Sequence, residues 1–147
     1  FYINGSRKEF TRGIPGDSAS TKWFADRSLR THPHFKQYQA HFDIRFAGGA
    51  VMNVIHLILE PNSCYCKSSK KALGGCAIWD LAAVSLMLQE VTGSVQFYDG
   101  TPLHLNRPHS IFFNDVGLLF TSPDLGYEEI STRVKRVETR MQVELLD

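Results

Sequence analysis

The sequence has no long run of apolar residues. Its longest apolar stretches, 51–59 and 81–88, are interrupted or short, whereas a helix that spans a bilayer needs about 18 apolar residues or more. The chain also lacks an excess of one charge, since its formal net charge is +1. It therefore has no basic field of the kind that attracts nucleic acid or anionic membranes. We expect neither a nucleic-acid partner nor a membrane partner.

Cysteine is scarce, with three in 147 residues. Cys64 and Cys66 would share one face of a strand, where alternate residues rarely form an unstrained disulfide. A zinc site with Cys76 as third ligand is an alternative, although these positions lack the paired spacing usual for zinc. The spacing favours buried reduced thiols, which are typical of a reducing compartment, and we expect a cytoplasmic location.

Common catalytic motifs are absent as well. The six histidines are scattered, without the H-E-x-x-H spacing of zinc hydrolases, and no serine lies in a nucleophile elbow. Asp99-Gly100-Thr101 lies between two alternating stretches, so we interpret it as a hairpin turn rather than a metal-binding loop. The sequence therefore offers no complete catalytic constellation of its own.

The length of 147 residues suits one domain with a substantial core. The chain begins Phe1-Tyr2-Ile3, with no signal peptide before it, so we expect a fragment, a processed chain or an excised domain. Residues 13–17 carry a loop signal rich in glycine and proline.

Helical and strand patterns alternate after Asp43. The patterns predict strands at 22–25, 43–47, 62–66, 94–98, 103–105, 111–113 and 117–121, and helices at 33–42, 50–59, 79–92 and 123–137. Such alternation predicts the α/β class, with helices packed against a sheet.

Asp80 is the most informative acidic residue, because the helix pattern at 79–92 predicts that its side chain turns inward. At about 100° per residue, the apolar positions fall close to Asp80 and the polar ones lie opposite. The apolar set is Val84, Met87 and Val91, and the polar set is Ser85, Gln89 and Thr92. A carboxylate on an apolar face is costly unless it caps the helix, pairs with a cation or binds a metal. Two compatible interpretations follow, a first-turn acid or a ligand for a hard cation such as Mg²⁺.

Two further segments have both a functional and a structural interpretation. Gly48-Gly49-Ala50 precedes a helix, where free backbone amides could approach a ligand, but a lone Gly-Gly pair favours a loop that simply needs glycine. Lys67, Lys70 and Lys71 lie in a polar stretch. They could contact an anionic ligand, or they could simply be solvated.

Three segments, in this order, resemble the C-terminal half of the inositol monophosphatase superfamily. They are Gly48–Asn53, Asn62–Lys67 and Ile78–Ala83. Trp79-Asp80-Leu81-Ala82-Ala83 matches the W-D-x-A-A signature of these Mg²⁺-dependent, often lithium-sensitive phosphomonoesterases, which include the 3′-phosphoadenosine 5′-phosphate phosphatases. Glu90, Gly93 and the turn at 99–103 match motifs farther along, with Thr92 where the family usually has a glycine. Residues 1–20 match poorly, and 21–147 are similar to the family's C-terminal lobe.

The resemblance implies a layered lobe with a mixed β-sheet covered by helices. It implies two or three Mg²⁺ ions in the complete enzyme, with Asp80 as one metal ligand and Gly49, Ala50 and Lys67 as substrate-binding residues. The other family ligands, a glutamate and a D-P-x-D-G-T motif, belong to an N-terminal half that this sequence lacks, so no catalytic residue is expected in this chain alone.

The same resemblance implies a small phosphorylated substrate, an inositol phosphate or a related sugar or nucleotide phosphate. Lys67 lies near the family's substrate-contacting glutamate, and Met52 lies where the nucleotide phosphatases favour lysine, so the substrate stays open. The expected partner is the missing N-terminal lobe or a second copy of the chain. The alternative is a non-catalytic, degenerate homologue that acts as a binding or regulatory module.

Overall fold

The computed structural model describes residues 2–7, 20–72, 74–113 and 115–144. The strands are β1 (Tyr2–Ile3), β2 (Ser6–Arg7), β3 (Lys22–Phe24), β4 (Asp43–Arg45), β5 (Ser63–Lys67), β6 (Ser94–Phe97) and β7 (Leu118–Thr121). The helices are the 3₁₀ helix η1 (Arg27–Thr31) and the α-helices α1 (Phe35–His41), α2 (Ala50–Leu59), α3 (Ile78–Glu90) and α4 (Tyr127–Glu144).

The main sheet has five strands in the order β4-β3-β5-β7-β6. β3 lies parallel to both β4 and β5, whereas β7 lies antiparallel to β5 and β6. The connection from β3 to β4 carries α1, and the connection from β4 to β5 carries α2, as parallel strands require a crossover. The prediction of an α/β lobe with a mixed sheet covered by helices is confirmed.

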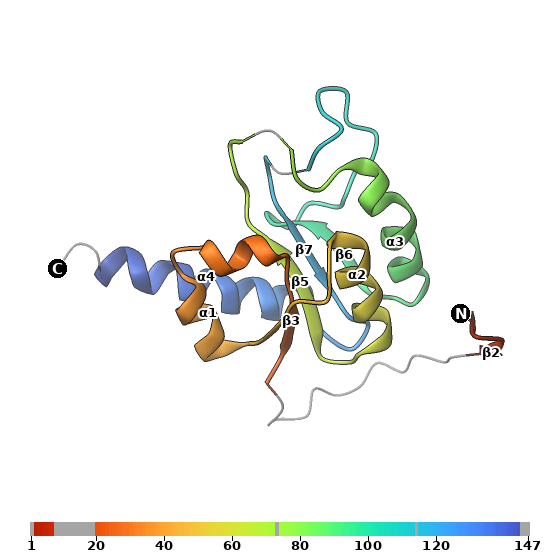
Figure 1. Ribbon diagram of the computed structural model, residues 1–147, viewed down its shortest axis with the longest axis horizontal. Helices are drawn as coiled ribbons and strands as arrows, with labels where there is room; N and C mark the ends of the chain where they lie inside the picture. The colour runs from red at the N-terminus through yellow and green to blue at the C-terminus, as the bar shows by residue number, and fades with distance from the viewer. Residues whose placement is uncertain (1, 8–19, 73, 114, 145–147) are drawn as a thin grey trace.

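Helices cover both faces of this sheet (Figure 1). α2 and α3 lie on one side and α1 and α4 on the other. A hydrophobic core lies on each side of the sheet, one under α2 and α3 and the other under α1 and α4. Strand β5 contributes to both, because Tyr65 faces the α2/α3 core while Cys64 and Cys66 face the α1/α4 core. Trp23, 1% exposed, anchors the α1/α4 core, with its ring edge-on to Tyr38 and Phe42. Alternation along fully buried strands thus builds two cores.

The three cysteines are free and buried, as the sequence predicted. Burial raises the pKa of Cys64 to about 12 and, more than any other cause, raises the pKa of Cys66 well above its usual value. The thiols are therefore protonated near neutral pH. The zinc alternative finds no support, since the described residues contain no group of three His, Cys, Asp or Glu side chains that could hold a metal ion.

Two predicted strands do not form. Residues 103–105 form no strand, and the one bridge nearby joins Gln96 to Pro102; segment 111–113 makes a single isolated bridge, Ala77 with Phe112. The loop between them is instead shaped by Arg107, whose guanidinium donates to the Phe112 carbonyl and to the Asp115 carboxylate and lies over the rings of Phe97 and Phe113. The side-chain contacts of Arg107 therefore hold this loop in place of the strand pairing that the alternating sequence pattern predicted.

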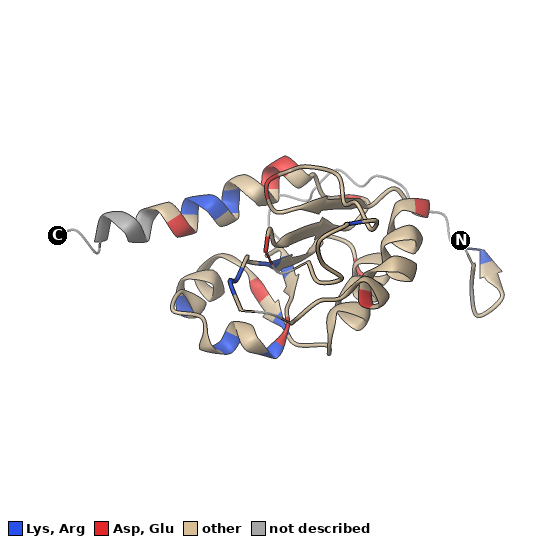
Figure 2. Ribbon diagram, turned by 90° about the horizontal axis from the view of Figure 1, so that it is seen from above, with Lys and Arg blue, Asp and Glu red and all other residues tan. Residues whose placement is uncertain are grey.

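The last helix begins later than predicted, at Tyr127 rather than at Pro123. Asp124 explains the delay, because its carboxylate accepts hydrogen bonds from the Asn62 backbone N–H and the Ser122 hydroxyl. These bonds hold the turn against the start of β5. α4 then extends past the sheet toward the C-terminus and carries acidic and basic residues along its length (Figure 2).

The N-terminal segment is described only in part. β1 and β2 form a two-stranded antiparallel pair, separate from the main sheet. The loop predicted at 13–17 lies outside the described residues, and the division into 1–20 and 21–147 stays a prediction. Within the described part of the chain, every helix is too short or too polar to cross a membrane.

Glu138 ties α4 to the rest of the α1/α4 layer. Its carboxylate accepts a hydrogen bond from the Tyr38 hydroxyl at 2.9 Å and another from the Tyr98 hydroxyl at 2.7 Å. Burial is the main cause that raises the pKa of both tyrosines, and Glu138 adds to it. Both hydroxyls therefore keep their protons and act as donors. One carboxylate thus links α1, α4 and the end of β6.

We expect Glu138→Ala to lower the free energy of unfolding by about 2 kcal/mol, because it leaves two largely buried hydroxyls without their charged acceptor. Urea denaturation followed by circular dichroism would measure the loss. Glu128→Ala, at an exposed position on the same helix, is the control and should cost less than about 0.5 kcal/mol. Equal losses for the two variants would contradict this assignment.

Candidate functional site

The candidate site lies where the parallel strands end. Asp26 follows β3, Gly48 and Gly49 follow β4, and Lys67 is the last residue of β5. The carboxyl ends of parallel strands meet at one edge of a sheet, where α/β proteins commonly bind ligands. The start of α3 reaches the same edge and brings Asp80 with it.

These segments line an open cavity of about 490 Å³, hereafter the Asp80 cavity. Its lining residues are Asp26, Arg27, Gly48, Gly49, Ala50, Lys67, Gly75, Cys76 and Asp80. The four residues that the sequence singled out, Gly49, Ala50, Lys67 and Asp80, therefore lie together although they come from three elements. Their roles in binding stay a prediction.

Asp80 lies in the first turn of α3, where its carboxylate accepts a hydrogen bond from the Ala77 backbone N–H at 2.9 Å. The first-turn interpretation is thus confirmed. One carboxylate oxygen makes this bond, and the half-buried side chain also borders the Asp80 cavity. The same group can therefore hold the helix start and face a ligand.

The predicted orientation of α3 is wrong by about a quarter turn. Its buried residues are Leu81, Val84, Ser85 and Leu88, so Asp80 lies at the edge of the buried face rather than at its centre. Ser85 was expected on the polar side, but its hydroxyl donates to the Ala82 carbonyl at 3.3 Å, which makes burial tolerable. Trp79, beside Asp80, is 65% exposed.

The backbone before α2 explains its two glycines differently. Gly48 has φ +143°, and a Cβ there would lie 3.2 Å from the Met52 Cβ, so glycine is required by local geometry. A Cβ at Gly49 would meet nothing within 4 Å. Gly49 is the N-cap of α2 and supplies no side-chain acceptor, so the first-turn amides of α2 have no cap. The structural interpretation is therefore confirmed for Gly48, whereas an approach of a ligand to the backbone at Gly49 stays a prediction.

Asp26 organises the wall between β3 and β5, and the sequence analysis missed it. Its carboxylate pairs with the Lys67 ammonium at 2.5 Å and accepts hydrogen bonds from the Asn53 amide at 3.1 Å and the Tyr65 hydroxyl at 3.3 Å. Burial first, and then the Asp26 charge, raises the pKa of Tyr65 well above its usual value, so the hydroxyl stays a donor. Its place directly after the predicted strand at 22–25 is informative only once that strand is known to lie parallel to its neighbours, since ligands bind at the carboxyl ends of such strands.

Asn53 connects this carboxylate to α2. It is fully buried, and its amide nitrogen donates to Asp26 and, at 3.4 Å, to the Gly48 carbonyl. Asn53 thereby fixes the start of α2 against the residue that follows β3. Its carbonyl oxygen has no hydrogen-bond partner in the described part of the chain.

Lys67 is held from both sides. Its side chain is 18% exposed and pairs with Asp26. Its backbone carbonyl is closely approached by Gly117, which has φ +81° and where a Cβ would lie only 2.6 Å from that oxygen. Lys67 is therefore placed by packing as well as by charge. Of the other two lysines, Lys70 lines a neighbouring cavity, and Lys71 is exposed.

The donor set suits a hard cation only in part. Asp80 offers carboxylate oxygen, which Mg²⁺ prefers, whereas Asp26 is already engaged by a cation and two neutral donors. The described residues contain no cluster of three potential metal ligands. Asp80 therefore offers one ligand to a hard cation, and the described residues do not complete a site for it. Arg27 and Lys67 line the same cavity, so it offers positive charge for an anion beside one carboxylate for a cation.

No family model matches this chain. No curated protein sequence matches it either. Solved inositol monophosphatase structures, however, share its fold. The Thermotoga maritima enzyme matches with a TM-score of 0.65 at 15% identity, over 95% of this chain and 49% of that one.

Two further inositol monophosphatase structures agree. The inositol monophosphatase-II of Staphylococcus aureus matches with a TM-score of 0.64 at 18% identity, over 97% of this chain and 50% of its own. The Anabaena enzyme gives 0.55 at 19% identity, over 85% and 46%. The chain thus has the fold of inositol monophosphatases and spans about half of their length, which fits the predicted C-terminal half.

A double-mutant cycle tests the contact between Asp26 and Lys67. Each single variant, Asp26→Asn or Lys67→Met, leaves a partly buried partner unpaired, and we expect each to cost about 2 kcal/mol of unfolding free energy. The double variant should cost about 1–2 kcal/mol less than the sum. Urea denaturation of all four proteins measures the coupling. A coupling of zero would show that the two charges do not stabilise one another.

Proposed function

We propose that this chain is the C-terminal lobe of a Mg²⁺-dependent phosphomonoesterase of the inositol monophosphatase type. Its substrate is an inositol phosphate or a related sugar or nucleotide phosphate, and its location is cytoplasmic. The shared fold supports this, and the solved structures with that fold include a staphylococcal inositol monophosphatase-II with bound inositol monophosphate and another with bound 2′-AMP.

One observation carries the proposal. The side chain of Asp80, the uncapped start of α2 and the Lys67 ammonium, which the family resemblance picks out from three distant segments, all line one cavity. A carboxylate that can take a hard cation beside groups that attract an anion is the arrangement that a metal-bound phosphate ester needs.

Each residue then has a distinct role. Asp80 would hold Mg²⁺ through the carboxylate oxygen that does not accept the Ala77 N–H. Bound Mg²⁺ would polarise the phosphate and lower the pKa of a coordinated water. Gly49 and Ala50 would lie against the alcohol part of the substrate, where the missing side chain of Gly49 leaves room. Lys67, fixed by Asp26, would contact a negatively charged part of the substrate.

The proposal requires a second lobe. Asp80 is one ligand, and Mg²⁺ usually keeps several waters unless more protein oxygens take part. An N-terminal lobe, from the same gene product or a partner chain, would supply the remaining carboxylates. Without it this chain would have no catalytic centre.

A non-catalytic module is the second candidate, and a specific contact favours it. Asp26 is paired with Lys67, and one oxygen of Asp80 accepts the Ala77 N–H, so neither side chain requires a metal to hold its position. A degenerate homologue could keep this arrangement for binding a phosphorylated ligand or for regulating a true phosphatase.

Phosphate release separates the two candidates. We expect the chain alone to release no phosphate from inositol 1-phosphate or 3′-phosphoadenosine 5′-phosphate, with or without Mg²⁺. Adding a polypeptide that carries D-P-x-D-G-T from the same source should produce Mg²⁺-dependent release. Turnover by the chain alone would refute the incomplete site, and no turnover with any such lobe would favour the module.

Asp80→Asn sharpens the test of metal binding, because an asparagine oxygen can still accept the Ala77 N–H and keep the helix start intact. In the two-lobe assay we expect activity to fall by about 100-fold or more. Asp99→Asn is the matched control, since Asp99 lies outside the lining of the Asp80 cavity and closes its own turn by accepting from the Thr101 N–H and hydroxyl. It should retain full activity within about twofold.

Paramagnetic Mn²⁺ reports on the same carboxylate without catalysis. We expect added Mn²⁺ to broaden the amide signals of Gly49, Ala77 and Asp80 in an NMR spectrum of the chain alone, at millimolar concentration because only one ligand is present. Asp80→Asn should remove the broadening and Asp99→Asn should not. Broadening that survives Asp80→Asn would place the cation elsewhere.

A further inference from the structure

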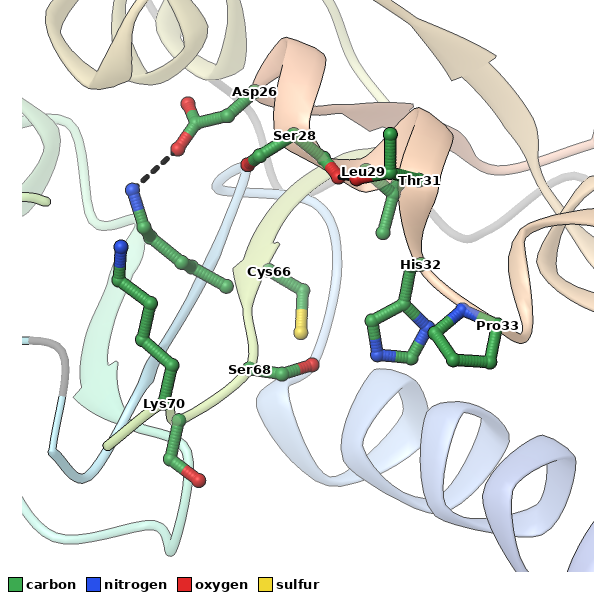
Figure 3. Close-up of a pocket in the computed structure, with 11 residues that line it drawn as sticks. Asp26, Ser28, Leu29, Thr31, His32, Pro33, Cys66, Ser68 and Lys70 are labelled. Carbon is green, nitrogen blue, oxygen red and sulfur yellow. Dashed lines mark hydrogen bonds and ion pairs between the residues drawn. The ribbon is translucent and has the colours of Figure 1, made fainter. Parts of the chain in front are cut away.

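His32 lies at the junction between η1 and α1, directly after η1 ends. Its side chain lines a second cavity of about 300 Å³, which we call the cavity beside η1. Figure 3 shows the ring projecting from the end of η1 toward α4, with Ser68 across the cavity. None of the roles proposed above makes use of this imidazole.

The His32 ring makes a hydrogen bond that exists only while the ring is neutral. Its Nδ1 accepts the backbone N–H of His34 at 3.3 Å. A ring nitrogen can accept only when it carries no proton, so the proton of the neutral ring lies on Nε2. A second proton would occupy Nδ1 and set two N–H donors against one another. Protonation of His32 therefore removes this bond.

Two neighbouring rings define the place that the neutral ring occupies. The His32 ring lies edge-on to His34, with 5.2 Å between centroids, and 5.6 Å from the ring of Tyr38. Tyr38 is fully buried, and its hydroxyl donates to Glu138. The imidazole thus packs against the edge of the α1/α4 core, where a charged ring is costly.

The charges around the ring act in opposite directions. Burial lowers the pKa of His32 most, the charge of His34 lowers it further, and the charge of Glu138 on α4 raises it. The guanidinium of Arg30, on η1 itself, lies over the Phe46 ring at 4.4 Å. The other titratable residues that line the same cavity are Asp26, Cys66, Lys67 and Lys70.

The net effect is that the folded chain holds a proton on His32 less tightly than an unfolded chain does. An unfolded chain protonates its histidines near pH 6.5, at about the value for a flexible peptide. The contribution of His32 to stability is therefore complete above this pH and decreases as the pH falls below it. The neutral ring stabilises the junction, and the charged ring opposes it.

We propose that His32 is a pH-sensitive switch at the junction of η1 and α1. Protonation drives the ring out of its place beside Tyr38 and opens the wall of the cavity beside η1. Three features act in the same direction, namely the lost bond from the His34 N–H, the like charge of His34 and the burial of the ring. Loss of one acceptor by one proton is sufficient, so no ligand is needed to operate the switch.

NMR spectra of the whole chain at about pH 8 and about pH 5 test the movement directly. We expect nuclear Overhauser contacts between the rings of His32 and Tyr38 at the higher pH and their loss at the lower pH. Contacts between Trp23 and Tyr38, whose rings lie 4.8 Å apart in the core, should persist at both and show that the fold is intact. The protection of the His34 N–H from hydrogen exchange should fall by about fivefold when its acceptor is lost.

Three variants assign the response to His32. His32→Asn keeps an oxygen that can accept the His34 N–H but cannot titrate, so protection of this N–H should be equal at both pH values. His34→Asn removes the neighbouring charge and should raise the titration midpoint of His32. His41→Asn, at an exposed position at the other end of α1, is the matched control and should leave the response of the native chain unchanged.

The native chain alone can refute the switch. Ring contacts between His32 and Tyr38 that persist at about pH 5 would overturn it, and so would a His32 midpoint at or above about pH 6.5. A fivefold fall in His34 protection that survives His32→Asn would overturn it as well, because the acceptor would then not be this ring. These measurements need neither metal nor substrate, so their outcome is independent of the proposed phosphatase function.

Discussion

The ion pair between Asp26 and Lys67 is the contact on which the site depends. It joins the ends of β3 and β5, two neighbouring parallel strands, and Asn53 extends the same network to α2. The Asp26 side chain is only 19% exposed. A carboxylate that is buried to this extent is stable only when cations and hydrogen-bond donors surround it. Asp26 meets that condition with one ammonium, one amide and one hydroxyl. Because the Asp26 charge needs these partners, it holds the ends of β3 and β5 and the start of α2 together at the edge where a ligand would bind.

Local patterns predicted most of the fold for physical reasons that can be named. α2 begins and ends where the sequence indicated, at Ala50 and Leu59, because glycines precede it and its buried face is continuous. The strand predicted at 103–105 did not form, because alternation cannot anticipate a cation such as Arg107, which shapes its loop through side-chain contacts with Phe97 and Phe112. The orientation of α3 failed for a similar reason, since a serine with a local acceptor can be buried like an apolar residue. Thr92 shows a further departure, with φ +66° where the resemblance has glycine.

The candidate site was predictable to the extent that a motif marked it. The family resemblance singled out Asp80, Gly49, Ala50 and Lys67, and the fold brings these four residues to one cavity. Asp26 belongs to no motif and precedes a 3₁₀ helix with little pattern, so only the strand order reveals its importance. The cavity beside η1 was equally hidden, because its lining comes from two segments that are far apart in the sequence, 26–33 and 66–70. Such sites depend on which strands are neighbours, and single-sequence periodicity does not determine this order.

The exposed indole of Trp79 has a practical consequence. The chain contains two tryptophans. Trp23 is enclosed in the α1/α4 core, while Trp79 lies on the surface next to Asp80. Their fluorescence should therefore separate, with blue-shifted, quencher-resistant emission from the first and red-shifted, quenchable emission from the second. The molecule thus carries an intrinsic optical probe one residue from Asp80, and the binding of a partner over this surface could be followed in real time without any attached dye.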